Sequence, residues 1–105
     1  MKAKPGEIWL ADLGLAAKTR PVLIVSRDDP DPPRVLVLYV PLTRQYRGSP
    51  YEVDLGQLRF LDHPSYANVQ GLGSLSVVRL ERFLGKIPPD LFDKVKAAIS
   101  FAMNL

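Results

Sequence analysis

A chain of 105 residues can bury one hydrophobic core but not two independent ones, so we expect residues 1–105 to form a single domain. The absence of cysteine excludes disulfide bonds, thiolate metal sites and a catalytic thiol, and a lone histidine argues against a histidine-built metal site. We therefore predict no metal ion and no cofactor. The net charge of +3 and the pI of about 9.4 mildly favour a polyanionic partner such as nucleic acid, although such an excess also serves solubility.

The hydrophobic residues are distributed as in a globular protein. They make up 47% of the chain and charged residues 24%, which is unlike the composition of disordered proteins. The positively charged first residues are followed by no hydrophobic segment long enough for a signal peptide or a membrane span. We expect a cytoplasmic protein with no membrane partner.

Three apolar segments in the first half predict β-strands. The first covers residues 7–13, and residues 15–19 form a short connection to the second. The second, residues 21–26 (PVLIVS), is a nearly continuous β-branched run, typical of a strand that is buried on both faces. A loop rich in proline and aspartate, residues 28–33, separates it from the third, residues 34–43 (RVLVLYVPLT). We expect the second and third strands to pair as a hairpin.

Weaker strand signals and one helix follow. After a polar loop over residues 44–50, the pattern predicts short strands at residues 51–55, 65–69 and 75–80. Beyond Pro88-Pro89, apolar residues recur at helical spacing to the end of the chain. They are Leu91, Phe92, Val95, Ala98, Ile99, Ala102 and Leu105. The fold class is therefore mainly β, a small barrel or sandwich with one C-terminal helix laid on the sheet.

Four phrases in this order resemble the MazF/PemK family of toxins. They are residues 6–10 (GEIWL), 20–26 (RPVLIVS), 40–43 (VPLT) and 84–87 (LGKI), so the likeness spans nearly the whole chain. The resemblance implies a small SH3-like antiparallel barrel, as in MazF, PemK and CcdB, and a homodimer. It also implies the toxin of a type II toxin–antitoxin system, which cleaves single-stranded RNA at selected sequences and is neutralised by a cognate antitoxin with an acidic tail.

The family resemblance points to Arg20 and Thr43 as catalytic residues. Metal-free RNA cleavage needs a 2′-hydroxyl to attack the adjacent phosphorus, and the charge of the transition state needs stabilisation. The planar guanidinium of Arg20 matches two phosphoryl oxygens, while Thr43 can donate or relay a hydrogen bond. If the second and third strands pair, the start of one and the end of the other lie at the same end of the hairpin.

Two further groups are candidates for RNA binding. The first lies in the loop after Thr43, where basic, amide and aromatic side chains suit phosphate contacts and base stacking. A plain polar hairpin loop explains this group equally well. The second lies where the family commonly carries an acidic residue followed by glutamine, and in some members an arginine two positions before the acid; this chain has Gln70-Gly71 and Asn68 at those places. The two amide side chains can position RNA but cannot exchange protons near neutral pH. The candidates are Arg44, Gln45, Tyr46, Arg47, Asn68 and Gln70.

Departures from the family pattern concern proton transfer. The loop before Arg20 is shorter than usual and lacks the family's glutamate. His63 is the obvious substitute base, but it lies in an Asp-His-Pro loop without a family counterpart, and we interpret it as a surface residue. Glu7 is interpreted as part of the first strand's structure.

Other aromatic and basic residues receive structural interpretations. Arg79 and Arg82 either extend a basic groove across a dimer or face solvent. The aromatic residues with apolar neighbours are expected in the core or a dimer interface. They are Trp9, Phe83, Phe92 and Phe101. Two other functions remain open: a non-catalytic MazF-like module that binds RNA or a protein partner, and a gyrase-poisoning toxin of the same fold.

Overall fold

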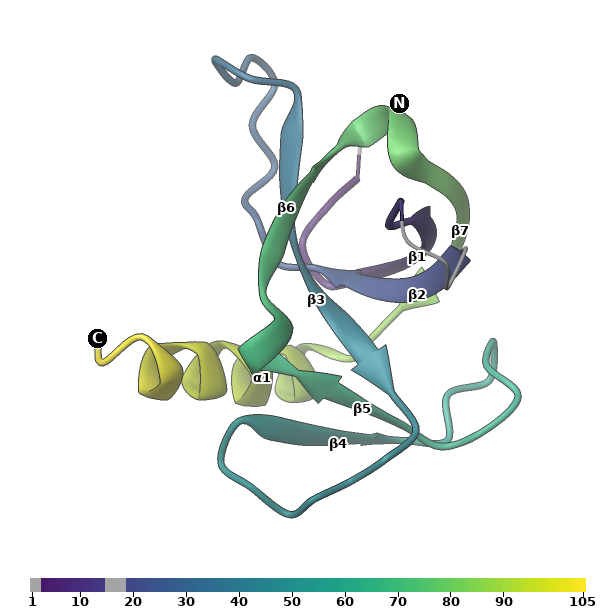
Figure 1. Ribbon diagram of the computed structural model, residues 1–105, viewed down its shortest axis with the longest axis vertical. Helices are drawn as coiled ribbons and strands as arrows, with labels where there is room; N and C mark the ends of the chain where they lie inside the picture. Colours follow the sequence, from purple (N-terminus) through teal and green to yellow (C-terminus); the bar gives the residue numbers. More distant parts are fainter. Residues whose placement is uncertain (1–2, 15–18) are drawn as a thin grey trace.

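The computed structural model describes residues 3–14 and 19–105 and shows a curled antiparallel sheet with one α-helix (Figure 1). The elements are β1 (Glu7–Asp12), β2 (Thr19–Ile24), β3 (Leu36–Thr43), β4 (Glu52–Gly56), β5 (Ser65–Asn68), the 3-10 helix η1 (Val69–Gly71), β6 (Gly73–Ser76), the 3-10 helix η2 (Val77–Arg79), β7 (Leu80–Lys86) and α1 (Pro89–Ala102). The predicted fold class, mainly β with a C-terminal helix, is confirmed.

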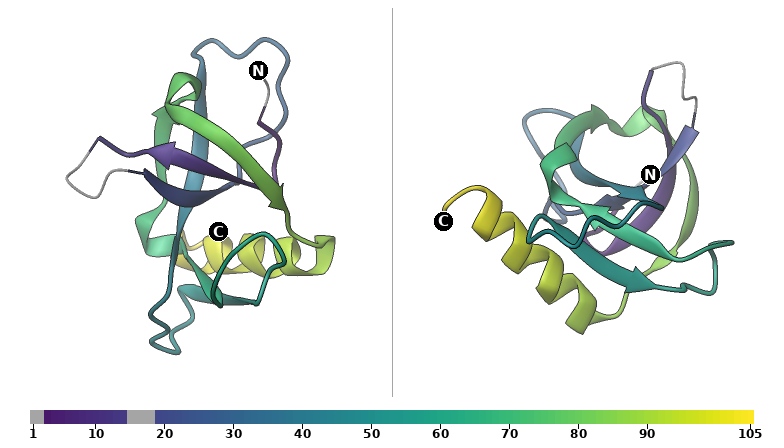
Figure 2. Two further views of the ribbon diagram at one scale, coloured as in Figure 1. Left: turned by 90° about the vertical axis from the view of Figure 1, so that its right-hand side faces the viewer. Right: turned by 60° about the horizontal axis from the view of Figure 1, so that its bottom comes forward.

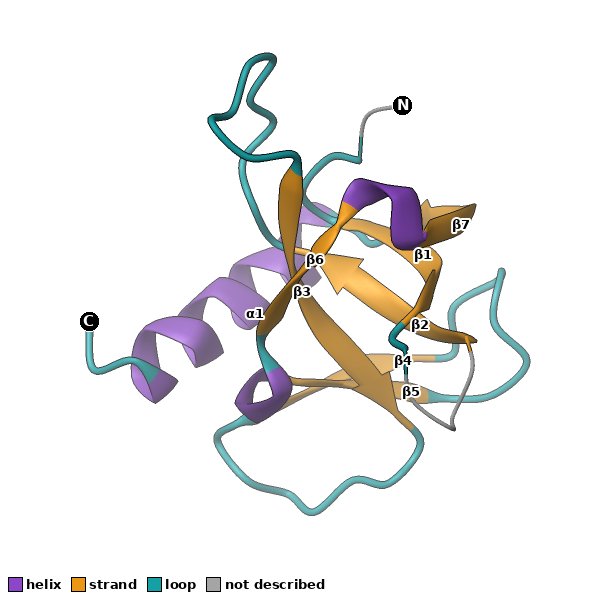
Figure 3. Cartoon of the chain, turned by 45° about the horizontal axis from the view of Figure 1, so that its top comes forward, coloured by secondary structure: helices purple, strands orange, loops and turns teal. Residues whose placement is uncertain are grey.

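The longest strand, β3, organises the sheet. Neighbouring strands follow the order β4-β5-β3-β2-β1-β7, and β6 also pairs with β3. The first half of β3 pairs with β6 and its last two residues pair with β5, while β2 lies along its other edge. Because η1 turns the chain between β5 and β6, both strands pair with β3 and the sheet bends around it, as the views in Figures 2 and 3 show.

The β2 strand separates two hydrophobic clusters, which confirms that it is buried on both faces. Val22 and Ile24 belong to the cluster that includes Trp9 and Leu75, whereas Leu23 belongs to the larger cluster beneath α1. All three β2 side chains are completely buried. Alternate side chains of one strand point to opposite faces, so a continuous apolar run is what a strand between two clusters requires.

The C-terminal helix covers one end of the sheet. Pro89 occupies its first turn with Asp90, an arrangement that favours a helix start because proline has no N–H to leave unpaired. Val95 is fully buried against the larger cluster, and α1 contacts β4 and η1 (Figure 2). The predicted helix is confirmed, but it ends at Ala102 and so leaves Leu105 outside. Over the ranges that the structure describes, no helix is long and apolar enough to cross a membrane.

Some predicted strand boundaries were wrong. The predicted strand at residues 75–80 contains the end of β6 and the turn η2, because the Ser76 hydroxyl accepts a hydrogen bond from the Val78 amide and caps that turn. The β7 strand was missed, since its outward residues 81–83 are all exposed and give no alternation. The expected connection at residues 15–19 lies outside the described residues except for Thr19, which begins β2.

Candidate functional site: a cationic pocket at the end of the β2–β3 hairpin

The pairing of β2 with β3 brings Arg20 and Thr43 to one end of a hairpin, as predicted. Val22 faces Pro41 and Leu23 faces Val40 in the antiparallel register. Continuing this register by two residues places Arg20 opposite Thr43. Arg20 lies within β2 rather than ahead of it, so its backbone is held by the sheet on the β1 side, where its partner is Ala11.

Arg20 and Thr43 line a shared pocket of about 400 Å³. Its wall comes from the start of β2, the end of β3, the loop that precedes β5, and β5 itself. The lining residues are Thr19, Arg20, Pro21, Leu42, Thr43, Arg44, Gln45, His63 and Ser65. Two of them are arginines and none is a carboxylate, so among the described lining residues the charge is positive and suits an anion.

Arg20 and Thr43 each keep hydrogen-bond donors that are available to a ligand. The Arg20 side chain is exposed and forms no ion pair or hydrogen bond with the rest of the described chain. The Thr43 hydroxyl accepts a hydrogen bond of 3.1 Å from the Gln45 amide, which orients the oxygen and leaves its own proton free to donate. A phosphodiester in this pocket would meet a guanidinium fork and a hydroxyl donor.

The loop after β3 is fastened at its far end by Glu52. The Glu52 carboxylate accepts hydrogen bonds from the Arg47 amide, the Ser49 amide and the Ser49 hydroxyl, at 3.1 to 3.4 Å. Desolvation would raise the pKa of Glu52, but the hydrogen bonds from Ser49 and Arg47, together with the Arg47 charge, hold that pKa below its ordinary value. The loop that carries four predicted RNA-binding residues is therefore tied to β4.

A pair of stacked tyrosines lies beside the pocket. The rings of Tyr46 and Tyr66 are 4.7 Å apart and only 11° from parallel. Tyr66 is the β5 partner of Thr43, and Tyr46 is 51% exposed. The pair gives Tyr46 a fixed ring plane, which is what stacking on an unpaired base requires. Tyr66 was missed from the sequence because its alternation in β5 indicates only a half-buried strand residue.

The six predicted RNA-binding residues do not all meet in the pocket. Arg44 and Gln45 line it, whereas Tyr46 and Arg47 continue along the loop. Asn68 and Gln70 do not line it; the Asn68 side chain accepts a 3.1 Å hydrogen bond from the Gln70 amide and caps η1. Asparagine is a favoured N-cap residue, so the local backbone structure is enough to explain an asparagine at position 68.

His63 and Ser65, which were not assigned to the site from the sequence, line the pocket. His63 was interpreted as a surface residue, but it is half-buried and belongs to the loop between β4 and β5. That loop lies on the same side of the molecule as the start of β2 and the end of β3 (Figures 1 and 3). Only the pairing of β5 with β3, which joins segments more than 20 residues apart, could have revealed this.

Residues interpreted as structural have structural contacts. Glu7 accepts hydrogen bonds from the Trp9 indole and the Lys4 amide, as expected for a residue that holds the first strand. The Trp9 ring is buried and meets Phe83 edge to face. The Arg79 guanidinium lies 3.3 Å from the Asp12 carbonyl oxygen, so it braces the end of β1.

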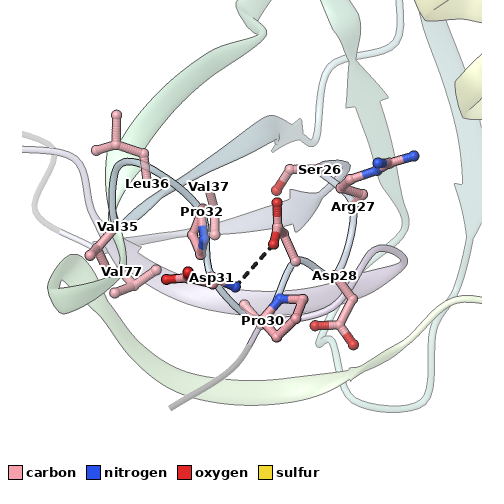
Figure 4. A pocket seen from close by; sticks show the side chains of 12 residues that line it. Ser26, Arg27, Asp28, Pro30, Asp31, Pro32, Val35, Leu36, Val37 and Val77 are labelled. Atoms are coloured by element: carbon pink, nitrogen blue, oxygen red, sulfur yellow. Dashed lines mark hydrogen bonds between the residues drawn. The ribbon is translucent and has the colours of Figure 1, made fainter.

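A second pocket, shown in Figure 4, lies at the opposite end of the β2–β3 hairpin. Its walls combine apolar residues such as Val35 and Val77 with the loop that follows β2. Within that loop the Asp29 carboxylate accepts a 3.0 Å hydrogen bond from the Asp31 amide. The volume is also about 400 Å³, but three aspartates line it against a single arginine, Arg27, and they would repel a phosphodiester. The Arg20 pocket is therefore the better candidate for a polyanion.

The fold and the pocket define a class of protein: a small curled antiparallel barrel whose β2–β3 hairpin presents a cationic, hydroxyl-bearing pocket at one end. Residues 4–103 match the sequence profile of the PemK-like, MazF-like toxin of type II toxin–antitoxin systems. The chain belongs to this family.

Individual relatives agree with this assignment. The chain is 31% identical over 100 residues to endoribonuclease MazF1 of Mycobacterium bovis and, equally, to endoribonuclease MazF4 of Mycobacterium tuberculosis, covering 95% of this chain and 91% of each relative. A mycobacterial endoribonuclease solved in complex with its cognate antitoxin superposes with a TM-score of 0.85 at 28% identity, covering 98% of this chain and 96% of the other. A MazE–MazF structure from Deinococcus radiodurans shares the fold, with a TM-score of 0.81 at 19% identity, covering 100% and 98%.

Proposed function

We propose that this protein is an endoribonuclease that cleaves single-stranded RNA without a metal ion, and that it acts as the toxin of a type II toxin–antitoxin system. The observation that carries the proposal is the shared pocket of Arg20 and Thr43, which is cationic and lies at the end of two paired strands. The names of its mycobacterial relatives, both endoribonucleases, support the same activity.

In the proposed reaction the 2′-oxygen of one nucleotide attacks the adjacent phosphorus. The bond from phosphorus to the 5′-oxygen of the next nucleotide breaks, leaving a 2′,3′-cyclic phosphate and a 5′-hydroxyl. Arg20 binds the phosphoryl oxygens and stabilises the negative charge that grows on them in the transition state. Thr43 donates its free hydroxyl proton to one of these oxygens, since its lone pair already accepts from the Gln45 amide.

We propose that the flanking nucleotides bind along the loop after β3 and the end of β5. Arg44 and Arg47 supply positive charge, Gln45 lines the pocket, and Tyr46 offers a ring plane held by Tyr66. Asn68 and Gln70 follow at the end of β5, where amide groups can hydrogen-bond to base edges. Such contacts select the sequence that is cut.

We propose two protein partners, a cognate antitoxin that binds at the Arg20 pocket and a second copy of the chain. The acidic tail of a cognate antitoxin would compete with RNA for Arg20 and Arg44, and the matched structures include an endoribonuclease solved with its cognate antitoxin and a MazE–MazF structure. We propose a homodimer in which residues 1–105 of each subunit form a single toxin domain. A cytoplasmic location places the protein with messenger RNA.

The test is cleavage of a 5′-labelled single-stranded RNA of mixed sequence by the purified protein in EDTA. The expected products carry a 2′,3′-cyclic phosphate and a 5′-hydroxyl. Arg20→Ala should lower kcat by about 10²–10³-fold, the usual cost of removing one donor that stabilises transition-state charge. Arg27→Ala is the matched control, because Arg27 follows the other end of β2 and lines the acidic pocket instead. Equal activity of the Arg20→Ala and wild-type proteins would refute the assignment.

The same preparation separates the two other candidate functions. A non-catalytic module would bind the RNA with an affinity that falls steeply with salt, yet leave it uncut. A gyrase poison would leave the RNA intact and block DNA supercoiling by purified gyrase. Cleavage in EDTA together with unaffected supercoiling excludes both.

A further inference from the structure

The proposed reaction needs a group that accepts the proton of the attacking 2′-hydroxyl, and the pocket contains a histidine. Neither Arg20 nor Thr43 is suited to accept the proton of the attacking 2′-hydroxyl at neutral pH, because a guanidinium has no lone pair to offer and a hydroxyl is a weak base. The pocket's described lining includes no carboxylate. His63, the only histidine of the sequence, lines this pocket with Arg20 and Thr43. Histidine is the side chain whose charge ordinarily changes between about pH 5 and 8.

The loop that carries His63 is held in place from several sides. Leu58 is 9% exposed, and Phe60 packs against the core cluster. The Gln57 side chain donates hydrogen bonds of 3.2 and 2.6 Å to the carbonyl oxygens of Leu58 and Leu61, which closes the loop on itself. A proton acceptor must stay within hydrogen-bonding reach of its substrate, so an anchored loop suits this role better than a free one.

One hydrogen bond of His63 determines which ring nitrogen can accept a proton. Nδ1 lies 3.1 Å from the carbonyl oxygen of Pro64. A carbonyl oxygen can only accept, so Nδ1 must carry the hydrogen. In the neutral ring the lone pair is then on Nε2, which is the arrangement of a histidine that acts as a general base.

The charged neighbours of His63 come from two other elements. Within the described part of the pocket they are Arg20 from β2 and Arg44 after β3, while Asp62 precedes His63 in its own loop. Both arginines can hold a phosphodiester beside the imidazole. Ser65, buried at the start of β5, donates a 3.4 Å hydrogen bond to the His63 carbonyl oxygen and fixes the backbone there.

We propose that His63 is the general base of this site, a catalytic role that rests on the endoribonuclease function proposed above. Nε2 takes the proton from the 2′-hydroxyl as the 2′-oxygen forms its bond to phosphorus. The bond from phosphorus to the 5′-oxygen breaks, the 5′-oxygen leaves with the electron pair, and it takes a proton from water. The imidazolium then returns its proton to solvent.

The decisive variant is His63→Asn. The asparagine amide NH₂ stands near the position of Nδ1 and can still donate to the Pro64 carbonyl oxygen, but it cannot accept a proton at neutral pH. The substrate is a short single-stranded RNA that contains one mapped cleavage site. We expect kcat to fall by about 10²–10⁴-fold, the usual contribution of a general base, with KM changed by no more than about threefold. Affinity for the same RNA with a 2′-deoxy group at the scissile nucleotide should be unchanged.

The pH profile and chemical rescue distinguish a base from a merely structural histidine. Wild-type kcat should rise with pH across the range in which histidine titrates, and His63→Asn should lose that rise. Added imidazole should restore part of the activity of His63→Ala, because it can take the vacated place of the ring. His63→Gln provides a second variant, with the same expected loss, should either of the other two proteins fail to fold.

The outcomes separate this proposal from the function on which it rests. A His63→Asn protein that cuts RNA at the wild-type rate with the wild-type pH profile overturns the role of His63, while an inactive Arg20→Ala leaves the endoribonuclease function standing. A wild-type protein that binds the RNA without cutting it overturns both. Low activity without rescue by imidazole and with an unchanged pH profile would make His63 a structural residue.

Discussion

Replacing Gly85 by alanine should destabilise the protein because of one aromatic ring. A Cβ atom at Gly85 would fall well inside contact distance of three Phe60 ring carbons, Cγ, Cδ2 and Cε2. The ring cannot simply swing into solvent without loss, since Phe60 packs against the larger core cluster. Gly85 has no positive φ, so the conflict is one of space and not of backbone conformation.

The expected cost is that of overpacking, about 1–3 kcal/mol. For a domain of this size each kcal/mol corresponds to about 4–8 °C in Tm, so Gly85→Ala should unfold at least about 4 °C below the wild-type protein. The measurement is urea denaturation at several temperatures together with a thermal scan. Because Phe60 belongs to the loop that carries His63, RNA cleavage should fall as well, by up to about 10²-fold for a displacement of 1 Å.

A double-mutant cycle isolates the ring as the cause. A Phe60→Ala background removes all three of the atoms that lie nearest to a Cβ at Gly85, and alanine is otherwise preferred to glycine in a strand. The destabilisation by Gly85→Ala should therefore nearly vanish there, giving a coupling energy of about 1 kcal/mol or more. An equal cost in both backgrounds would refute the packing argument.

Two further predictions concern RNA binding, measured by fluorescence anisotropy with a 2′-deoxy-substituted RNA, and a third concerns the order of the loop after β3, measured by amide hydrogen exchange. Tyr66→Ala should weaken binding by about 1–3 kcal/mol through loss of the fixed Tyr46 platform, whereas Tyr66→Phe, which retains the ring, should bind like wild type. Arg44→Ala should lower the slope of log affinity against log salt by about one, and an unchanged slope would remove Arg44 from the phosphate contacts. Because the pKa of Glu52 is lowered in the folded protein, its contribution to loop order is present above its ordinary value of 4.5 and is lost as pH falls through the folded pKa. The protection of the Arg47 amide, its exchange rate relative to the intrinsic rate at the same pH, should therefore fall below about pH 4.5, and in Glu52→Gln that protection should be low at every pH.

The strands that lie between two clusters were the easiest to predict, because burial on both faces leaves a continuous apolar run. Residues 22–24 form such a run and proved completely buried. The edge strand β7 was missed for the opposite reason. Arg82 and Phe83 are both exposed, so polar and apolar residues do not alternate along this strand. Short polar contacts, such as the Ser76 cap of η2, decide where β6 ends and cannot be read from hydrophobic pattern.

The candidate site was predictable only for the residues that lie on strands consecutive in the sequence. Arg20 and Thr43 belong to one hairpin, so their proximity follows from the pairing of two strands that are consecutive in the chain. His63 and Tyr66 reach the same place through the pairing of β5 with β3, for which the sequence carries no local signal. The sequence indicated a surface position for His63 but gave no sign that this position lines the Arg20 pocket.

The division of the pocket between strands and loops suits the proposed chemistry. In the proposed reaction Arg20 and Thr43 would meet the phosphate from the ends of paired strands, where the backbone is rigid and the charge can be placed in advance. The loops add groups that must adapt to different bases, and Glu52 and Phe60 anchor those loops to β4 and the core. A site built in this way can change the RNA sequence it selects through its loops while the phosphate-binding hairpin stays the same, because the two depend on separate contacts.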